Sequence, residues 1–351
     1  MSAQRRPTMA DVAALARVSL STVSLTYSGA GPISPDMRAR VEKAATALGY
    51  AGPSPRAQAL RSGRSRVVGL VIHEQLQYAL RDPFTLRVLD ALIGDLGEMG
   101  LGVLLLPSPS ADTTESNLLA TASMDAAVLM RVRDHDEPAL EILARRELPF
   151  GIVEGTAPGA AAITIPDRRA TADLIRHLVG FGHERIATVT LPRGTRGATA
   201  IYEGELLAGA LWTPTRNRLA AFEDAGVEPC VVVESHASMV EAGVAAGHLA
   251  FGHASRPTAV VCQSDLLAGG VALAARELGL DVPEDVSITG FDGLDLPWLQ
   301  PLDLTTVPQD GAAKGHLIAQ SVKALLAGAE PPVIELPLEI RIGNSTAHAP
   351  R

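Results

Sequence analysis

The chain has little of what membrane, exported or disulfide-bonded proteins need. Its 351 residues include two cysteines, Cys230 and Cys262, which lie far apart and without a partner pattern. It contains no apolar run of about 18 residues, and residues 1–20 carry charges instead of the apolar core of a signal peptide. These absences argue against membrane insertion, export, a disulfide scaffold and a thiolate metal site, and they predict a protein of the reducing cytoplasm.

The sequence as a whole lacks positive charge, but its first segment does not. The chain holds 30 basic and 39 acidic residues, a net charge of −9. Residues 1–66 hold 10 of the basic residues against Asp11, Asp36 and Glu42, which leaves 20 basic and 36 acidic residues in the remainder. The first segment therefore carries +7 and the remainder −16, so only the first segment suits a polyanion such as DNA.

Three short helices are predicted at the start of the chain. Thr8, with Asp11 three residues later, forms a capping box ahead of an apolar stripe. Ser19 caps a second helix after a connection too short for antiparallel packing, which is typical of a helix-turn-helix. Ser34, followed by a proline, begins a third helix. Residues 1–50 are therefore predicted to form a small DNA-binding head.

Seven motifs along the chain occur in the order of one protein family. They read MADVAALARVSLSTVS, RVEKAATALGY, PSPRAQALRSGRS, GFGHERIATV, SDLLAGGV, DVSITGFDG and PLDLTTV. By these motifs the chain is identified as a member of the lactose/galactose repressor (LacI/GalR) family of bacterial transcription regulators, over nearly its whole length. The resemblance implies a repressor whose affinity for a palindromic operator is controlled by an effector bound between two lobes.

The resemblance also places the second helix of the head in the major groove of DNA. The residues that match base-reading positions are Leu20, Ser21 and Leu25, and those that match phosphate-holding positions are Ser19, Thr22 and Ser24. Leu25 departs from the polar residue of many relatives and cannot make a bidentate contact to guanine. The alternative for Leu25 is packing in the core of the head.

Residues 51–66 are predicted to be a linker that contains a hinge helix too short to be stable alone. In the family this helix folds on DNA, pairs with its twin from a second subunit and inserts a leucine into the minor groove. Leu60 matches that leucine and Ala57 the small residue beside it. Such an insertion would unstack a base step and bend the duplex. The alternative is a flexible linker with an incidental leucine.

From Val67 onward, apolar strand-like segments alternate with amphipathic helical ones in two successive series. Segments such as VVGLVI and AAVLM are apolar throughout, which is typical of parallel strands buried on both faces. The predicted fold class is an all-α head followed by an α/β core of two doubly wound, periplasmic-binding-protein-like lobes. The first lobe is expected at residues 67–165 and 294–327, and the second at residues 166–293 and 328–346.

Effector-binding side chains are expected where strands end, because ligands of doubly wound sheets bind at the carboxyl ends of the strands. The candidates, from position or family motif, are His73, Glu154, Arg218, Ser264 and Asp292. An arginine and carboxylates facing one cleft can hold a ring of hydroxyls or clamp a charged ligand, and a sugar or sugar derivative is the family default. The alternative for each candidate is a solvated loop end.

Three further features are predicted near this cleft. Asp265 is expected to cap the helix after its strand. Phe84 and Trp298 are the nearest candidates for an aromatic platform under a sugar ring, in a chain that is 3% aromatic. Residues 193–214 form a longer connection than the family needs, and they could cover the cleft with a short helix as a lid.

Two other classes of function compete with a regulator. For an enzyme, the sequence offers no P-loop, no GxGxxG after a strand, no metal-ligand cluster and no nucleophile elbow, so no catalytic residue, cofactor or metal is predicted. A solute-binding protein would have similar lobes but a signal peptide in place of the basic head. The prediction is a cytoplasmic homodimer that binds duplex DNA and a carbohydrate and no membrane; a ligand-dependent activator and a co-repressor-requiring regulator remain open.

Overall fold

The computed structural model describes residues 7–28, 31–53, 63–73, 76–108, 117–133, 137–194 and 197–350. These fall into two compact units, Met1–Arg66 and Val67–Arg351. The predicted hinge residues Ala57 and Leu60 lie outside the described residues.

The first unit contains the three predicted helices. They are α1 (Met9–Ala16), α2 (Leu20–Ser28) and α3 (Pro35–Leu48). The capping box is confirmed, because the Thr8 hydroxyl accepts from the Asp11 N–H while the Asp11 carboxylate accepts from the Thr8 N–H at 2.8 Å. The three helices bury Val12, Val23 and Val41 completely. Local caps and one small apolar core therefore suffice to specify the helix-turn-helix.

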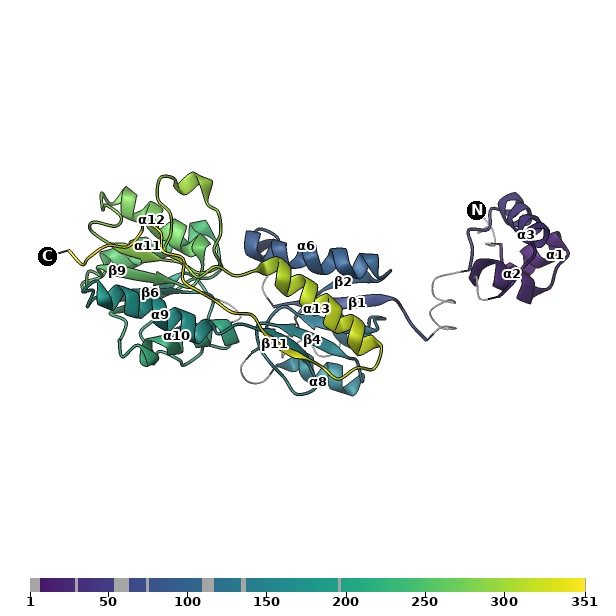
Figure 1. Cartoon of the computed structure of the whole chain (residues 1–351), viewed down its shortest axis with the longest axis horizontal. Coiled ribbons are helices and arrows are strands. Elements are labelled where there is room, and N and C mark those ends of the chain that lie inside the picture. The colour runs from purple at the N-terminus through teal and green to yellow at the C-terminus, as the bar shows by residue number, and fades with distance from the viewer. Residues whose placement is uncertain are drawn as a thin grey trace. The chain divides into compact units, whose positions relative to one another are not determined.

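The second unit is two α/β lobes (Figure 1). The first lobe has a six-stranded parallel sheet in the order β11-β5-β4-β3-β1-β2. Its strands are β1 (Val67–Ile72), β2 (Gly102–Pro107), β3 (Ala126–Leu129), β4 (Phe150–Val153), β5 (Ala161–Thr164) and β11 (Val333–Glu335). Its helices are α5 (Leu76–Ala79), α6 (Pro83–Glu98), α7 (Leu118–Thr121), α8 (Pro138–Arg145) and α13 (Gly311–Leu326).

The second lobe has a five-stranded sheet in the order β10-β9-β6-β8-β7, parallel except for the antiparallel edge strand β7. Its strands are β6 (Ile186–Thr190), β7 (Ala200–Ile201), β8 (Val231–Glu234), β9 (Ala259–Cys262) and β10 (Ser287–Thr289). Its helices are α9 (Asp167–Gly180), α10 (Thr213–Asp224), α11 (Val240–Gly252), α12 (Asp265–Glu277) and the 3-10 turn η1 (Pro297–Leu299).

Helices α6 and α13 lie side by side on one face of the first sheet (Figure 1). Gly315 of α13 makes this approach possible, since a Cβ there would stand 2.4 Å from the Val88 carbonyl oxygen and 2.7 Å from the Ala91 Cβ. The α6–α13 pair is therefore packed backbone against backbone at this point.

Two segments lie in lobes other than those predicted. Leu299 and Leu304, expected in the first lobe, are buried in the core of the second. Strand β11, expected in the second lobe, pairs with β5 of the first. Pro337 lies two residues after β11 and has no N–H for a ladder, which agrees with a strand of only three residues. The chain therefore returns to the first lobe for α13 and β11 and ends against the second lobe, where the Ser345 hydroxyl donates to the Ile288 carbonyl.

The 193–214 insertion does not form the predicted short helix within its described part. Residues 206–209 are a turn, and Ala200–Ile201 add the edge strand β7. Arg193 holds the loop together from inside, because its guanidinium lies 3.8 Å from the centre of the Tyr202 ring and donates to the Leu206 carbonyl at 2.9 Å. The insertion is thus an ordered loop built around a buried arginine.

Candidate functional site

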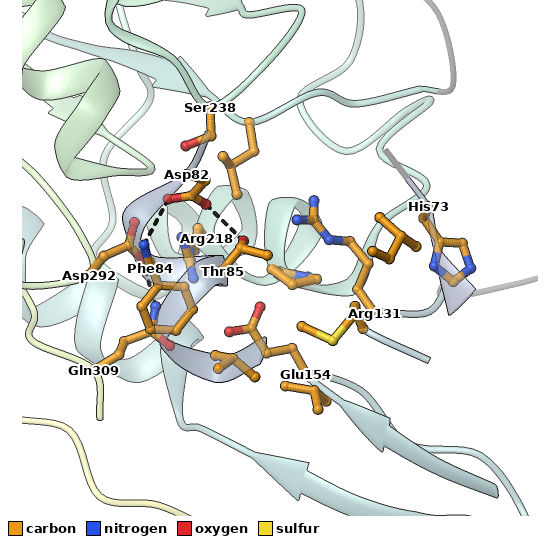
Figure 2. Close-up of a pocket in the computed structure, with 16 residues that line it drawn as sticks. His73, Asp82, Phe84, Thr85, Arg131, Glu154, Arg218, Ser238, Asp292 and Gln309 are labelled. Carbon is orange, nitrogen blue, oxygen red and sulfur yellow. Dashed lines mark hydrogen bonds between the residues drawn. The ribbon is translucent and has the colours of Figure 1, made fainter. Parts of the chain in front are cut away.

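A cleft between the lobes opens at the carboxyl ends of the strands, as predicted for doubly wound sheets. Its inner chamber, about 40 Å³, has room for a few water molecules. The lining residues, drawn in Figure 2, are Ile72, His73, Asp82, Phe84, Thr85, Val88, Met130, Arg131, Val153, Glu154, Leu191, Pro214, Arg218, Ser238, Asp292 and Gln309. An outer chamber of about 510 Å³ shares Ile72, His73 and Arg131 with it. Four of the five predicted effector residues therefore line one inner chamber.

Glu154 and Asp292 face this chamber from opposite lobes, and both have left-handed backbones. Their φ angles are 65° and 113°, unusual for residues other than glycine. Glu154 directly follows β4, and Asp292 lies three residues beyond β10, each followed by a glycine. Such conformations cost about 1–3 kcal/mol each and cluster where side chains must be aimed at a ligand.

A hydrogen-bonded chain links these two carboxyl groups. The Lys314 ammonium donates to Glu154 Oε1 at 2.5 Å and also to the side-chain oxygen of Gln309. The amide of Gln309 in turn donates to Asp292 Oδ1 at 2.7 Å. Lys314 is completely buried, with its Nζ 5.1 Å from the centre of the Phe84 ring. One ammonium on α13 therefore supports the first-lobe carboxylate directly and the second-lobe carboxyl through an amide.

The surroundings of the two carboxyl groups shift their pKa values in opposite directions. Burial would raise the pKa of Glu154, but Lys314 and Arg218 outweigh it and hold that pKa below its usual range. Burial raises the pKa of Asp292 well above its ordinary value, although Arg218 opposes the shift. The charged form is therefore disfavoured by burial at Asp292 and favoured by the neighbouring cations at Glu154.

Arg218 of α10 forms the back of the second-lobe side of the chamber. Its guanidinium carbon lies 3.7 Å from the centre of the Phe291 ring, and one of its NH2 groups donates to the Gln263 carbonyl at 2.5 Å. Its Nε lies 3.9 Å from Asp167 Oδ2 and has no hydrogen-bond partner, although it is buried. An unpartnered donor of this kind at the wall of a chamber is suited to a ligand oxygen.

His73 lies where the two chambers meet. Its Nε2 pairs with Glu137 at 3.1 Å, which leaves a buried Nδ1 without a partner. The ring of Trp212, from the end of the insertion, lies edge-on to His73 with the ring centres 5.1 Å apart. Trp212 also lies under the Arg133 guanidinium, 5.4 Å from the centre of its ring. The insertion therefore contacts the first lobe beside the outer chamber, although it belongs to the second.

The fifth candidate, Ser264, stands behind the chamber wall and not in it. Its hydroxyl accepts from the Leu267 N–H at 3.2 Å and so caps α12, the role that was predicted for Asp265. It also accepts from Ser238, which does face the chamber, at 2.9 Å. Asp265 is buried and accepts from the Thr306 hydroxyl and the Leu294 N–H. Both residues can cap a helix, so the sequence left the choice between them open.

Of the two aromatic candidates, Phe84 lines the inner chamber and Trp298 does not. Trp298 is 46% exposed and packs on Gly269 of α12. Sequence reasoning missed Asp82, Thr85, Arg131, Ser238, Gln309 and Lys314. Arg131 could have been found, because it closely follows β3 and obeys the same strand-end rule as Glu154. Lys314 could not have been identified from the sequence, because its partner Glu154 is 160 residues away in the chain.

In the head, α2 divides cleanly into a buried and an exposed side. Val23 and Thr26 are buried against α1 and α3, whereas Leu20 is 53% exposed and Ser21 is exposed beside it. The Ser19 hydroxyl accepts from the Thr22 N–H at 3.1 Å, which confirms it as the cap.

The remaining candidates on α2, Thr22, Ser24 and Leu25, are half-buried. Leu25 is absent from the cluster of buried residues that forms the core of the head's described part. Of the predicted contact residues, Ser19, Leu20 and Ser21 are thus exposed, whereas Thr22, Ser24 and Leu25 are only partly accessible, and their contacts to DNA stay a prediction.

A helix-turn-helix joined to a two-lobed ligand-binding core defines the class of DNA-binding regulators controlled by small molecules. Family models bear this out: residues 8–52 match the bacterial regulatory proteins of the lacI family, and residues 175–346 match the periplasmic-binding-protein-like domain. The chain is 33% identical over 323 residues to the HTH-type transcriptional regulator Rv3575c of Mycobacterium tuberculosis, covering 89% of each. It is 28% identical to the regulator IpsA of Corynebacterium glutamicum, covering 98% of each.

The chain belongs to the LacI family of DNA-binding transcriptional regulators. Among solved structures, it is similar to a LacI family regulator from Corynebacterium glutamicum, with a TM-score of 0.71, 26% identity and coverage of 98% and 100%. The chain is also similar to the regulator CelR in its complex with cellobiose, with a TM-score of 0.62 and 27% identity. The match covers 97% of this chain and 100% of that one. The fold of the lac repressor dimer bound to operator is also similar, with a TM-score of 0.77 at 23% identity over 98% and 100% of the two chains.

Within the described ranges, no three His, Cys, Asp or Glu side chains are grouped so that they could hold a metal ion. No helix in the described part of the chain is long and apolar enough to cross a membrane.

Proposed function

We propose that this regulator is a homodimeric repressor of the bacterial cytoplasm whose affinity for a palindromic operator is changed by a sugar or sugar derivative bound between its lobes. The observation that carries the proposal is the meeting of Glu154 from the first lobe and Asp292 from the second at one chamber. A ligand that bonds to both carboxyl groups must couple its binding to the relative position of the lobes.

The inner chamber alone is too small for a sugar ring, but it adjoins the outer chamber at Ile72, His73 and Arg131, and together their chemistry suits a polyhydroxylated ring. Phe84, Val88 and Val153 offer an apolar surface to the carbon face, while carboxyl, guanidinium and hydroxyl groups surround it for the hydroxyls. The CelR relative is described in complex with cellobiose, which supports a carbohydrate. His73, Glu154, Arg218 and Asp292 are the proposed contacts, and Ser264 acts through Ser238.

The dimer is proposed from the surface of the first lobe. Leu86 and Ile93 of α6 are 41% and 42% exposed, and Leu105 of the edge strand β2 is 38% exposed. Helix α6 packs beside β2, so these side chains form one apolar area beside an unpaired sheet edge. A second copy of the chain covering this area would bring two heads to two half-sites, and Leu20, Ser21 and Leu25 would read each half-site.

The experiment is selection of bound duplexes from a random DNA pool by the full-length protein at two salt concentrations. We expect a palindromic site whose binding weakens steeply as salt rises. The selected duplex then serves to screen sugars for a change in affinity of roughly 5- to 150-fold, the usual range of allosteric coupling. A solute-binding protein would select no duplex, and a sugar that strengthened binding would indicate a co-repressor instead of an inducer.

The hinge is tested separately with Leu60→Ala. We propose that Leu60 unstacks a base step beside Ala57, so the variant should bind the selected duplex more weakly at the same salt concentration. Equal binding by parent and variant would show that Leu60 is not inserted.

A further inference from the structure

We infer that Trp212 is a clasp between the two lobes and that it sets how readily they separate. This role goes beyond the proposed function, because it belongs to the protein without an effector and without DNA. Trp212 lies near the end of the 193–214 insertion and comes from the second lobe, yet its ring contacts His73 and Arg133 of the first.

The backbone at Trp212 is joined to the first lobe by hydrogen bonds. Trp212 forms an isolated antiparallel bridge with Arg133, which lies shortly after strand β3. The Thr213 N–H and hydroxyl both donate to the Val132 carbonyl at 3.3 Å. The start of α10 is therefore held against the segment after β3, and the indole ring is presented to the first lobe.

The indole ring of Trp212 is buried in a socket formed by His73 and Arg133. Only 4% of Trp212 is exposed. Its ring lies edge-on to His73, with the ring centres 5.1 Å apart, and the Arg133 guanidinium lies 5.4 Å from its centre. Aromatic pairs and cations over aromatic rings both attract, and the attraction is stronger away from water. The indole N–H donates to the Gly194 carbonyl at 3.3 Å, so the second lobe fixes the orientation of the ring.

Glu137 fixes the socket within the first lobe. Its Oε2 pairs with His73 Nε2 at 3.1 Å and accepts from the Arg133 N–H at 3.1 Å. Its Oε1 accepts from the Ala139 N–H at the start of α8, and the side chains of His73 and Glu137 are each 1% exposed. The socket is therefore held by the first lobe alone, and the Trp212 ring can leave it without breaking these bonds.

The Trp212 contact differs from the other connections between the lobes. The chain crossovers are covalent, whereas the ring touches the first lobe only while the lobes are close. The ion pair between Arg81 and Glu241 also joins the lobes, at 2.9 Å, but its side chains are 56% and 69% exposed, and pairs so exposed contribute little. Leu266 and Leu294 pack with the first-lobe core and are untouched when Trp212 is altered, so the lobes should separate more often without unfolding.

Three substitutions separate the clasp from a role in folding the insertion. Trp212→Ala empties the socket, and the ratio of separated to closed lobes should rise about 2- to 10-fold, the effect of one aromatic contact. Trp212→Phe keeps a ring but loses the N–H that binds Gly194, and it should stay near the parent. His73→Gln can still donate to Glu137 but removes the aromatic partner, so it should also raise the ratio. It should add little to Trp212→Ala, because both remove the same contact.

The measurement is the distance between two spin labels, one on each lobe, by double electron–electron resonance of the full-length protein without effector or DNA. The labels are placed at Ala144→Cys of α8 and Ala245→Cys of α11, two exposed positions. Cys230→Ser removes the half-buried native thiol, and Cys262 is buried. Excess unlabelled protein ensures that a dimer holds one labelled protomer. Trp298→Ala, which removes an exposed tryptophan of the second lobe, is the matched control and should leave the distances unchanged.

Unchanged distances in Trp212→Ala, or an equal change in Trp298→Ala, would overturn the inference. Full additivity of His73→Gln and Trp212→Ala would also overturn it, because the two residues would then act independently. If Trp212→Ala does not fold, His73→Gln alone decides, since lobes that separate no more than in the parent have the same meaning. None of these outcomes bears on the operator or the effector of the proposed function, which the duplex selection tests separately.

Discussion

Replacing Gly315 with alanine should loosen the first lobe by a calculable amount. The added Cβ would stand 2.4 Å from the Val88 carbonyl oxygen and 2.9 Å from the Leu92 nitrogen, against 3.4 Å for ordinary contact, so α6 and α13 must separate by about 1 Å. Overpacking of this kind costs about 1–3 kcal/mol, and contacts to backbone atoms, which cannot rotate away, favour the upper end. Alanine has a higher helix propensity than glycine, which offsets about 1 kcal/mol of this loss of stability. The net loss is therefore about 2 kcal/mol.

The matched control is Gly94→Ala in α6, where a new Cβ would meet no atom within 4 Å. It should stabilise the protein by up to about 1 kcal/mol. Urea unfolding followed by tryptophan fluorescence measures both variants, because both tryptophans, Trp212 and Trp298, lie in the second unit. If Gly315→Ala were as stable as Gly94→Ala, the two helices would not be in backbone contact and the reasoning would be refuted.

Three further outcomes are expected. Trp298→Phe leaves Trp212 as the only tryptophan, and its emission should change when a ligand enters the outer chamber; Trp212→Phe, which leaves Trp298, should show no change. Burial lowers the pKa of His183, so the unfolded chain takes up its proton first as the pH falls below about 6.5, and His183→Gln should flatten the loss of stability between pH 7 and 5. Thr8→Ala removes the capping box and should destabilise the head by about 1 kcal/mol, seen as earlier loss of helical circular dichroism with unchanged tryptophan unfolding.

The head could be predicted closely because its signals are local. Ser19 and Ser34 cap the helices that follow them, and Thr8 lies three residues from its partner Asp11. The buried first strand was equally clear, since VVGLVI corresponds to β1 residue for residue. Caps and apolar runs are readable wherever the interacting residues are neighbours in the chain.

The parts that could not be predicted depend on residues distant in sequence. The partners of Lys314 lie directly after β4 and on the crossover before α13. A lysine in a helix would ordinarily be assigned to the surface. Strand β11 was assigned to the wrong sheet because three residues carry no information about their neighbour. Trp212 was noticed as part of an insertion, but its contact with His73 of the other lobe is a property of the tertiary structure alone.

Because β11 lies near the end of the chain, the first lobe is completed late during synthesis. The head and strands β1 to β5 leave the ribosome early, yet the sheet of the first lobe stays open at β5 until Val333–Glu335 have been made. The nascent chain therefore contains the complete head long before the sheet of the first lobe is complete. A chain that ended after β10 would therefore contain the head but lack both α13 and β11 of the first lobe.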